Sequence, residues 1–450
     1  MTTPYNGAAL RRKNLIGFNA CIYHTAGVLN DGKEEDFVFM KHVKGNAMIG
    51  QSGGPTSAIN ATLAGVYKAA RDSEYIETVY GLVHGIEGLL KGDIADMSIG
   101  LKTDEDIDIL AATPSAYLGS CRFKLPKVED KPEVFDKIFE MFSKNNVKYF
   151  FYIGGNDSMD TVHKLSLHAA KIGYEINIMG VPKTIDNDLA ATDHTPGYGS
   201  AAKYIATATR EVSRDASVYP SKCVTIMEIM GRNAGWLTAA TALARCENCD
   251  APDLIYVPEL MFDIDKFVED VKKVSEKKDC VIVAVSEGAK IDKDTYVCEA
   301  LSKGETDAFG HKHLSGTARV LADIVNERLG LKTRQIEFGL LQRCAAHSAS
   351  ATDISESRMI GARAVEEAVN GNTGEMVYFV RESNDPYKVS IASMDIAKIA
   401  NVEKVIPREW INEEGNNVTQ EAIDYMLPLI QGEAPVFMKD GLPMHAVLKK

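Results

Sequence analysis

The chain has 450 residues, enough for two domains or one large α/β unit with a sizeable hydrophobic core. Its formal net charge of −13 argues against nucleic acid or an anionic membrane surface as the main partner. No apolar run approaches the roughly 18 residues of a membrane span, and no basic region followed by an apolar core opens the chain, so we expect a cytoplasmic protein. The eight cysteines include one CxxC pair, Cys246 and Cys249, which without a second pair indicates reduced thiols rather than a zinc site.

Residues 1–45 show no sustained hydrophobic period, and we expect an N-terminal extension of unclear role there. The core then opens with an apolar strand at 47–51, the glycines Gly53 and Gly54, and a segment of helical period at 58–70. A strand, a glycine turn and a helix in this order direct backbone N–H groups and the positive end of the helix at an anion. The turn matches neither GxGxxG nor GxxxxGK[ST], so the sequence indicates neither a dinucleotide site nor a P-loop.

A second glycine turn follows the buried strand predicted at 147–153. It carries Asn156 and Asp157 and precedes a helix expected from about Met159. The carboxyl ends of parallel strands lie at the same edge of a sheet, so this turn and the first one are expected to meet there. The sequence therefore predicts phosphate-binding backbone at that edge.

The third strand end is predicted at Pro182, which cannot continue a helix or a central strand. Beyond it, an ammonium, a hydroxyl and two carboxylates fall within about 10 Å of one another, at roughly 3.3 Å per extended residue. Such a cluster suits phosphoryl transfer, in which one acid takes a hydroxyl proton and the cation neutralises developing phosphate charge. The alternative that these residues alone leave open is a polar loop whose acids cap turns. The groups belong to Lys183, Thr184, Asp186 and Asp188.

Further along the chain, charged side chains stand near the ends of predicted strands or at turns. Such positions suit a protein that binds a phosphosugar, although each arginine alone is equally explained by a solvated face or a salt bridge. Strand and helix patterns alternate from 47 to 370, which favours two α/β layers with mainly parallel sheets. The side chains are Arg122, Arg232 after a strand at 224–229, Glu287 after a strand at 280–285, and Arg334 and Arg343 on either side of a segment at 336–341.

Six motifs in one order resemble the phosphofructokinase family, and the match runs from about 47 to 432. The lysine at 183 and the motif DAFGHK at 307–312 are most similar to the pyrophosphate-dependent branch, because ATP-dependent members usually carry glycine in place of Lys183. The motifs are SGGPTSAIN at 52–60, LGSCRF at 118–123, GGNDS at 154–158, PKTIDND at 182–188, MGRNAGWL at 230–237 and LLQR at 340–343.

This resemblance implies a phosphofructokinase-like α/β fold of two Rossmann-like, three-layer α/β/α domains with mainly parallel sheets. The larger domain, expected to bind pyrophosphate, would comprise 46–197 plus about 345–400. The smaller domain, expected to bind the sugar phosphate, would comprise 198–344. Residues 401–450 would form a C-terminal segment that packs on the core. Because the family's site is shared between subunits, the resemblance also implies a homodimer.

The implied activity is reversible transfer of a phosphoryl group from pyrophosphate to the 1-hydroxyl of fructose 6-phosphate with Mg²⁺, a step of glycolysis and gluconeogenesis. Asp186 would be the general base, with Lys183, Asp157 and Arg232 as further catalytic residues. The other implied contacts are Thr184, Ile185, Met230, Gly231, Arg232, Glu287, Leu340 and Arg343 to fructose 6-phosphate, Arg334 to the same ligand from a neighbouring subunit, Gly53, Gly54 and Arg122 to pyrophosphate, and Asn156 and Asp188 to the metal.

Asp157 bears on the choice of donor, since ATP-dependent members carry glycine there and a carboxylate would fill and repel the place of the nucleotide α-phosphate. Three positions depart from the family pattern. Asn156 replaces a metal-associated aspartate, Leu340 a polar sugar contact, and Cys223 an arginine of the adjacent subunit, for which Lys222 is a candidate substitute. Two alternatives therefore stand beside the main hypothesis: an ATP-dependent 6-phosphofructokinase and a non-catalytic paralogue that binds a sugar phosphate.

Overall fold

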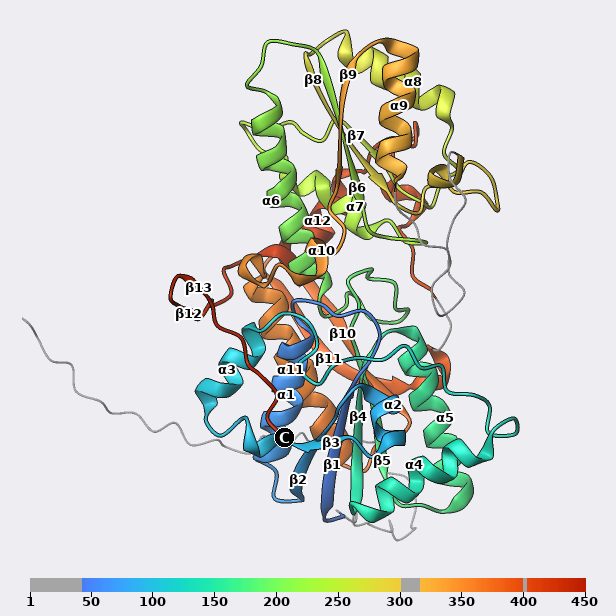
Figure 1. Cartoon of the computed structure of the whole chain (residues 1–450), viewed down its shortest axis with the longest axis vertical. Coiled ribbons are helices and arrows are strands. Elements are labelled where there is room, and N and C mark those ends of the chain that lie inside the picture. Colours follow the sequence, from blue (N-terminus) through green and yellow to red (C-terminus); the bar gives the residue numbers. More distant parts are fainter. Residues whose placement is uncertain (1–42, 301–315, 400–402) are drawn as a thin grey trace, which may run out of the picture. The chain divides into compact units, whose positions relative to one another are not determined.

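The computed structural model describes residues 43–300, 316–399 and 403–450. Most of the extension predicted over 1–45, and the motif at 307–312, lie outside the described residues. Within them the chain forms two main β-sheets, and helices cover both faces of each (Figure 1). This arrangement confirms the α/β class with mainly parallel sheets that the alternating pattern predicts.

The larger sheet has seven strands in the order β11-β10-β5-β4-β1-β2-β3. Its inner strands run parallel, whereas β3 and β11 pair antiparallel with their neighbours at the two edges. Strands β5, β4 and β1 are adjacent, so the three predicted glycine and acid loops start from neighbouring strands. The strands are β1 (Gly45–Gln51), β2 (Ile76–Leu82), β3 (Ile94–Asp96), β4 (Val147–Gly154), β5 (Asn177–Pro182), β10 (Glu375–Asn384) and β11 (Tyr387–Asp395).

Two hydrophobic clusters sandwich this sheet, because its central strands are apolar on both faces. Along β4, Tyr149 and Phe151 face one cluster. Phe150 and Tyr152 face the other, as the alternation of side chains along a strand requires. The helices that complete the first cluster are α1 (Ile59–Arg71), α3 (Asp104–Ala112) and α11 (Ala351–Val369), and those that complete the second are α2 (Gly85–Lys91), α4 (Pro132–Lys144) and α5 (Asn156–Ile172).

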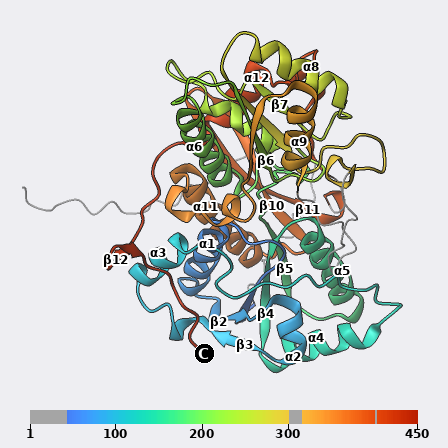
Figure 2. The ribbon, with the colours of Figure 1, turned by 45° about the horizontal axis from the view of Figure 1, so that its top comes forward.

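The smaller sheet has four parallel strands in the order β7-β8-β6-β9. Central strand β6 is buried along its whole length, whereas edge strand β9 has no buried residue and alternates between exposed and partly buried positions. Figure 2 shows the helices on the two sides of this sheet. The elements are β6 (Cys223–Ile229), β7 (Leu254–Tyr256), β8 (Cys280–Ser286) and β9 (Lys332–Glu337), with α6 (Tyr198–Ala216), α7 (Trp236–Ala240) and α12 (Gln420–Met426) on one face and α8 (Ile264–Ser275) and α9 (Thr317–Leu329) on the other.

Short elements connect these layers. Helix α10 follows β9 directly and faces the site described below, and a two-stranded hairpin lies close to the C-terminus. No helix in the three described ranges is long and apolar enough to cross a membrane. The short elements are α10 (Leu341–Cys344), β12 (Met438–Lys439), β13 (Leu442–Pro443) and the 3₁₀ turns Met97–Ile99, Thr241–Ala244, Val297–Ala300, Ala346–Ser348, Ile396–Lys398, Arg408–Trp410 and Leu427–Ile430.

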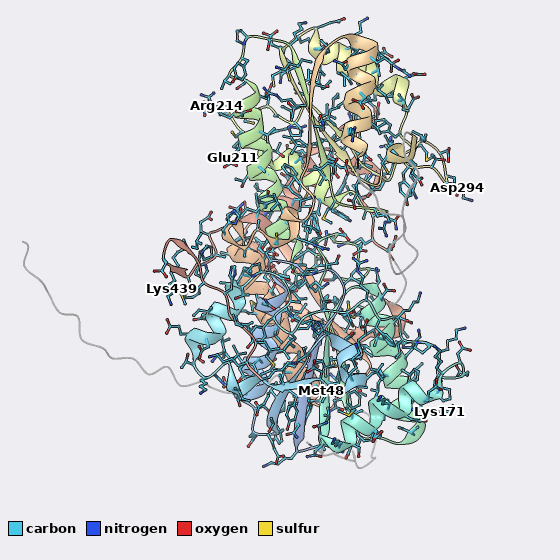
Figure 3. All side chains as sticks on the ribbon, viewed as in Figure 1. Met48, Lys171, Glu211, Arg214, Asp294 and Lys439 are labelled. Atoms are coloured by element: carbon cyan, nitrogen blue, oxygen red, sulfur yellow. The ribbon has the colours of Figure 1, made fainter. Side chains whose placement is uncertain are left out.

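Charged side chains mostly cover the outside of these layers, and apolar ones fill the inside. Figure 3 shows Lys171, Glu211 and Asp294 pointing outward, whereas Met48 lies within the larger sheet and is fully buried. This separation is what the ordinary composition of the chain leads one to expect, because burying apolar surface is the main force that stabilises the layers.

Three predicted boundaries differ from the structure. Helix α5 begins at Asn156 rather than about Met159, because the positive end of the helix accommodates the acid in its first turn. Strand β9 ends at Glu337 instead of covering 336–341, since this exposed edge strand is mostly polar and gives no apolar run. The apolar run at 376–380 predicts a short strand. In the structure this strand is β10, which is ten residues long and forms a hairpin with β11. Pro182 is the last residue of central strand β5, which confirms the strand end predicted there.

Candidate active site

The first glycine turn links β1 to α1, and a neighbouring loop holds it. Gly53 has φ +76°, a left-handed conformation that favours glycine. Its N–H donates to the carbonyl of Cys121 over 3.1 Å, and the hydroxyl of Ser120 donates to the carbonyl of Gly53 over 2.6 Å. Arg122 follows this pair directly and is exposed. The turn and the predicted pyrophosphate-binding arginine are thus parts of one packed unit.

Lys183 connects all three strand ends. Its side chain is buried, and its ammonium donates to the carbonyl of Gly54 over 2.5 Å. Its backbone N–H donates to the carbonyl of Gly154 over 2.9 Å, which attaches the acid loop to the second glycine turn. Burial lowers the pKa of Lys183 to about 8, with a smaller contribution from repulsion by Arg343. The negative charge of Asp186 acts in the other direction and raises this pKa. The predicted meeting of three strand ends at one sheet edge is confirmed.

The loop after Lys183 presents two carboxylates on either side of a buried asparagine. The hydroxyl of Thr184 accepts from the N–H of Asp186 over 3.1 Å and closes a tight turn. Asn187 is fully buried and has φ +54°, a left-handed conformation that asparagine tolerates better than most residues. The hydroxyl of Thr195 donates to the carbonyl of Thr184 over 2.8 Å. The backbone around Asp186 and Asp188 is therefore fixed from both sides.

The smaller sheet supplies Arg232 and Glu287 through a close approach of two backbone segments. The hydroxyl of Ser286 donates to the carbonyl of Gly231 over 2.5 Å, and the N–H of Gly231 lies 3.4 Å from the carboxylate of Glu287. Gly231 has φ +136°, and a Cβ there would lie 2.4 Å from the carbonyl of Ala234. Only glycine fits this position, and it holds Arg232 beside Glu287.

Arg343 approaches the first glycine turn from the smaller sheet. It lies in α10, and its neighbour Gln342 accepts from the N–H of Met230 over 3.0 Å, which aligns α10 with the end of β6. A Cβ on Gly54 would lie 3.1 Å from a guanidinium nitrogen of Arg343. Strand ends of both sheets therefore face the same site, and the ammonium of Lys183 and the guanidinium of Arg343 lie close to Gly54.

The carboxylates of the site hold protons more tightly than ordinary acids. Burial raises the pKa of Asp186, against the opposing charges of Lys183 and Arg232. Burial and the charge of Asp186 raise the pKa of Asp188 to about 7 and that of Glu287 to about 8. Asp186 and Asp188 keep some solvent exposure, but protein atoms surround both side chains. A carboxylate with a raised pKa accepts a proton more readily, which suits a general base.

The start of α5 carries the residues predicted to contact the metal and to select the donor. Asp157 is exposed in the first turn of the helix, where the helix dipole favours an acid. The side-chain oxygen of Asn156 is buried and has no hydrogen-bond partner. An oxygen in that state suits a hard cation. The described residues contain no group of three or more His, Cys, Asp or Glu side chains placed to bind a metal. An Mg²⁺ ion held at Asn156 would therefore take most of its ligands from phosphate and water oxygens.

Arg334 lies away from this cluster within its own chain. It is in the middle of β9 rather than near a strand end as predicted, and it pairs with Thr225. Thr225 precedes Met230 by five residues, roughly 16 Å along an extended strand. The guanidinium instead lies 3.5 Å from the carboxylate of Asp215 and 5.9 Å from the ring centre of Tyr219. The sequence did not reveal this position because β9 lacks an apolar run.

Of four further predicted positions, two have buried side chains and two have exposed ones. Ile185 is buried in the hydrophobic core on one face of the smaller sheet, so only its backbone can serve a ligand. Leu340 is 62% exposed. Cys223 is buried at the start of β6, and the ammonium of its neighbour Lys222 donates to the carbonyl of Ser275 over 2.6 Å. Within its own chain, Lys222 thus caps the C-terminal end of α8.

The C-terminal segment adds residues that the sequence pattern does not reveal. The N–H of Lys404 donates to the carbonyl of Asp188 over 2.8 Å. The neighbouring Glu403 raises the pKa of both Asp186 and Asp188, and it accepts from the side-chain amide of Asn233 over 3.2 Å. No periodic pattern marks this segment, so no signal in the sequence predicted its place in the site.

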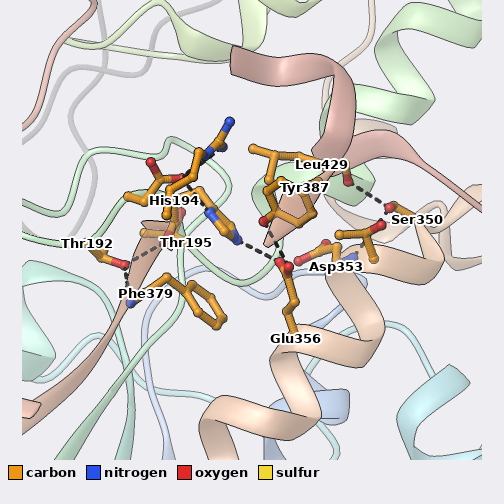
Figure 4. A network of polar contacts seen from close by, with 12 residues as sticks. Thr192, His194, Thr195, Ser350, Asp353, Glu356, Phe379, Tyr387 and Leu429 are labelled. Atoms are coloured by element: carbon orange, nitrogen blue, oxygen red, sulfur yellow. Dashed lines mark hydrogen bonds and ion pairs between the residues drawn. The ribbon is translucent and has the colours of Figure 1, made fainter. Parts of the chain in front are cut away.

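A buried polar network supports the chain directly after the acid loop (Figure 4). The ring of His194 lies between two acids, with Nδ1 2.8 Å from Asp193 and Nε2 2.7 Å from Glu356. Burial lowers the pKa of His194, but these hydrogen bonds outweigh it and raise the pKa overall. The ring also stacks on Phe379, and the hydroxyl of Tyr387 donates to Glu356 over 2.8 Å. The network joins the segment after the acid loop to α11 and β11.

Glycine turns, a buried lysine, arginines from the facing sheet and carboxylates of raised pKa define an α/β phosphotransferase. Residues 46–368 match the phosphofructokinase family. The chain belongs to that family, as its motifs predict.

Three similar proteins illustrate the match. The chain is 41% identical over 411 residues to an enzyme of Halomonas elongata named pyrophosphate--fructose 6-phosphate 1-phosphotransferase, covering 90% of this chain and 96% of that one. The crystal structure of pyrophosphate-dependent phosphofructokinase from Nitrosospira multiformis matches with a TM-score of 0.81 and 39% identity, over 91% of this chain and 99% of that one. A protein of Alkalicoccus urumqiensis named sulfofructose kinase is 32% identical over 367 residues, 81% of this chain and 91% of that one.

Proposed function

We propose that this protein transfers a phosphoryl group reversibly from pyrophosphate to the 1-hydroxyl of fructose 6-phosphate. The observation that carries the proposal is the buried ammonium of Lys183. It contacts the donor-side turn at Gly54 and is attracted by the opposite charge of Asp186. An ammonium in that place can neutralise charge on the phosphoryl group in transit. The relatives at 41% and 39% identity carry names that specify pyrophosphate.

The reaction forms a bond between the sugar O1 and one phosphorus of pyrophosphate, and it breaks that phosphorus's bond to the bridging oxygen. Asp186 takes the proton of the 1-hydroxyl as the new bond forms, and the bridging oxygen leaves with inorganic phosphate. The proton then passes to the departing phosphate or to water. In reverse, Asp186 donates the proton to O1 of fructose 1,6-bisphosphate. Its raised pKa serves both directions, since it lets the carboxyl group carry the proton between steps.

The two sheets would divide the substrates between them. Gly53, Gly54 and Arg122, at the carboxyl edge of the larger sheet, would bind pyrophosphate through backbone N–H groups and a guanidinium. Residues of the smaller sheet would bind the sugar phosphate, with Arg232 and Arg343 as charged partners. The remaining sugar-phosphate contacts in this proposal are Thr184, Ile185, Met230, Gly231, Glu287 and Leu340. This division corresponds to the proposed larger domain (46–197 plus about 345–400) and smaller domain (198–344), with 401–450 packing on both.

Mg²⁺ is the cofactor we propose. Asn156 and Asp188 would contact it, and when bound it would neutralise negative charge on pyrophosphate. The buried, unpartnered oxygen of Asn156 supports this assignment. Asparagine brings an oxygen ligand without a charge, so we expect weaker metal binding than an aspartate at this position would give.

Asp157 would make the donor pyrophosphate rather than ATP. Its carboxylate is exposed in the first turn of α5, beside the second glycine turn. A nucleotide α-phosphate placed next to it would meet an uncompensated like charge. The ATP-dependent alternative requires this repulsion to be tolerated.

We also propose a homodimer in which Arg334 serves the site of the neighbouring subunit. Its place in the middle of an exposed edge strand, away from its own cluster, supports this reading. Large apolar side chains are exposed nearby: Tyr219, whose ring centre lies 5.9 Å from the guanidinium of Arg334, is 60% exposed, and Leu341, shortly after β9 in sequence, is 57% exposed. Such surface is commonly covered by a partner.

The test is a coupled assay of the purified protein with fructose 6-phosphate and Mg²⁺, run in parallel with pyrophosphate and with ATP. We expect turnover with pyrophosphate alone, lost in Asp186→Asn. Turnover with ATP alone would establish the ATP-dependent alternative. Silence with both donors, together with measurable binding of fructose 6-phosphate, would establish the non-catalytic paralogue. Sulfofructose as a second acceptor checks whether the site prefers the substrate named for the relative from Alkalicoccus urumqiensis.

A further inference from the structure

The residue between the two acids has a strained backbone, and side chains from later in the chain bind its side chain, among them the hydroxyl of Thr195 at 3.5 Å. Asn187 is fully buried with φ +54°. Its side-chain oxygen accepts from the ammonium of Lys404 over 3.3 Å, and its amide donates to the hydroxyl of Tyr425 over 3.0 Å. A residue held in the left-handed region persists only when its surroundings determine it. These two contacts are therefore candidates for what fixes the direction of the flanking carboxylates.

Lys404 makes several hydrogen bonds to this loop. Besides Asn187, its ammonium donates to the carbonyls of Thr192 and Asp193 over 3.1 and 2.6 Å. An ammonium has three donors, and here each has an acceptor in the segment that follows Asp186. Its backbone N–H donates to the carbonyl of Asp188. One residue thus binds the loop at four points.

The other face of Lys404 is attached to the smaller-sheet side. The indole N–H of Trp236 donates to the carbonyl of Lys404 over 3.1 Å, and the ammonium lies 5.3 Å from the centre of the Trp236 ring. Trp236 begins α7, which follows the turn that carries Arg232. Lys404 therefore connects the loop of the predicted base to the element behind the predicted sugar-phosphate arginine.

Tyr425 completes the support from α12. Its hydroxyl donates to the carbonyl of Asp193 over 2.5 Å, and its ring lies 4.4 Å from the guanidinium carbon of Arg381. Both Lys404 and Tyr425 lie beyond 368, where the family match ends. The support for the acid loop thus comes from a part of the chain that the family match does not cover.

We propose that Lys404 is a positioning residue for the reaction: by holding Asn187, with Tyr425 opposite, it sets the directions in which Asp186 and Asp188 point. This inference rests on the proposed function. Lys404 does not touch the reacting atoms, so its removal should impair turnover while leaving substrate binding largely intact. A general structural role would instead lower stability without separating kcat from KM.

The experiment compares Lys404→Met with a matched control, Lys203→Met. The ammonium of Lys203 also donates to a backbone carbonyl, that of Gly432 over 2.5 Å, but away from the site. For Lys404→Met we expect kcat with pyrophosphate to fall roughly 10- to 100-fold, with both KM values within about threefold of the wild type. Lys203→Met should keep the wild-type kcat. Asn187→Ala should lower kcat similarly, and adding Lys404→Met to it should cause little further loss, because both act through one contact.

Hydrogen exchange measures the positioning without relying on turnover. Amides of residues 184–193 should exchange faster in Lys404→Met than in the wild type or Lys203→Met. Wild-type kcat in Lys404→Met, or a loss equal to that of Lys203→Met, would overturn the proposal, as would unchanged exchange in 184–193. If the wild type itself shows no turnover, the proposed function fails, and the exchange comparison still decides whether Lys404 orders the acid loop.

Discussion

The ammonium of Lys183 lies 2.5 Å from the carbonyl oxygen of Gly54, although the two residues follow different strands, β5 and β1. This hydrogen bond fixes the distance between the donor-side glycine turn and the acid loop. An ammonium has three donors, and one is used here, so the others remain to face an anion bound between the two loops. The contact explains how a lysine three residues before Asp186 can serve a phosphate at the end of β1, two strands away in the sheet.

Replacing Lys183 by methionine tests this arrangement. We expect kcat with pyrophosphate to fall by about 10²- to 10³-fold, because the transferring group loses a positioned positive charge. The KM for fructose 6-phosphate should change little, since Arg232 and Arg343 remain. Steady-state kinetics in both directions is the measurement.

The matched control is Lys164→Met. Its ammonium also donates to a backbone carbonyl, that of Leu125 over 2.8 Å, but outside the site. It should keep wild-type kinetics. Equal losses in the two variants would mean that Lys183 only supports the fold and would contradict its role in transfer.

The donor preference is tested at Asp157. We expect the pair Asp157→Gly with Lys183→Gly to lose activity with pyrophosphate and to gain some with ATP, because both the repulsion and the added cation are removed. Asp157→Asn separates charge from volume, since it keeps the size and removes the charge. If Asp157→Gly gains activity with ATP and Asp157→Asn does not, the volume of the side chain is the barrier. If Asp157→Gly and Asp157→Asn both gain activity with ATP, its charge is the barrier. Unchanged donor preference in every variant would show that neither Asp157 nor Lys183 selects the donor.

The residues of the site that the sequence predicted share one property: each follows a strand or a turn with a strong local pattern. Lys183 and Asp186 come directly after a buried apolar strand, and Gly53 precedes a clear helix. The contacts that Lys404 and Tyr425 make were not predicted, because they depend on the return of an irregular segment to the core. Such a contact is decided by tertiary packing, and no local period records it.

The same reasoning explains the fold. Strand β4 was predicted to within one residue because both its faces are buried, and its apolar run is unmistakable. Strand β9 was placed four residues too late, because as an exposed edge strand it alternates polar and apolar residues only weakly. The hairpin of β10 and β11 was missed beyond its first residues, since its outer strand is partly exposed and mixed in character.

Glu287 predicts a pH dependence of stability in the protein without substrate. Burial raises its pKa from an ordinary value of 4.5 to about 8. Between these values the folded protein holds a proton that the unfolded chain has released, so stability falls as pH rises through this window. Glu287→Gln removes this loss. We expect its Tm to exceed that of the wild type by more at pH 8 than at pH 5. The corresponding gain in the free energy of unfolding between the two pH values should be roughly 1 kcal/mol or more.

The control for this measurement is Glu247→Gln, which changes an exposed acid. It should follow the wild-type dependence on pH. The window closes near pH 8, the pKa of Glu287 in the folded protein. Above that pH the titration of Lys183, whose pKa burial lowers to about 8, changes stability in the opposite direction. A wild-type pH dependence retained in Glu287→Gln would show that its carboxyl group does not carry the effect.

Arg334 gives the sharpest test of the proposed shared site. Arg334→Ala should raise the KM for fructose 6-phosphate about 10- to 100-fold, the cost of one charged hydrogen bond to a phosphate. In a two-fold dimer that shares its sites, mixing Arg334→Ala with the inactive Asp186→Asn should produce heterodimers in which one site has both wild-type residues. The Asp186→Asn subunit would lend its intact Arg334 to the site of its partner. Random exchange should then restore about a quarter of wild-type activity at low fructose 6-phosphate, measured after co-expression with two affinity tags. Activity no higher than the average of the two parent variants would place Arg334 outside the shared site, because no arrangement of subunits would then bring it to the partner's Asp186.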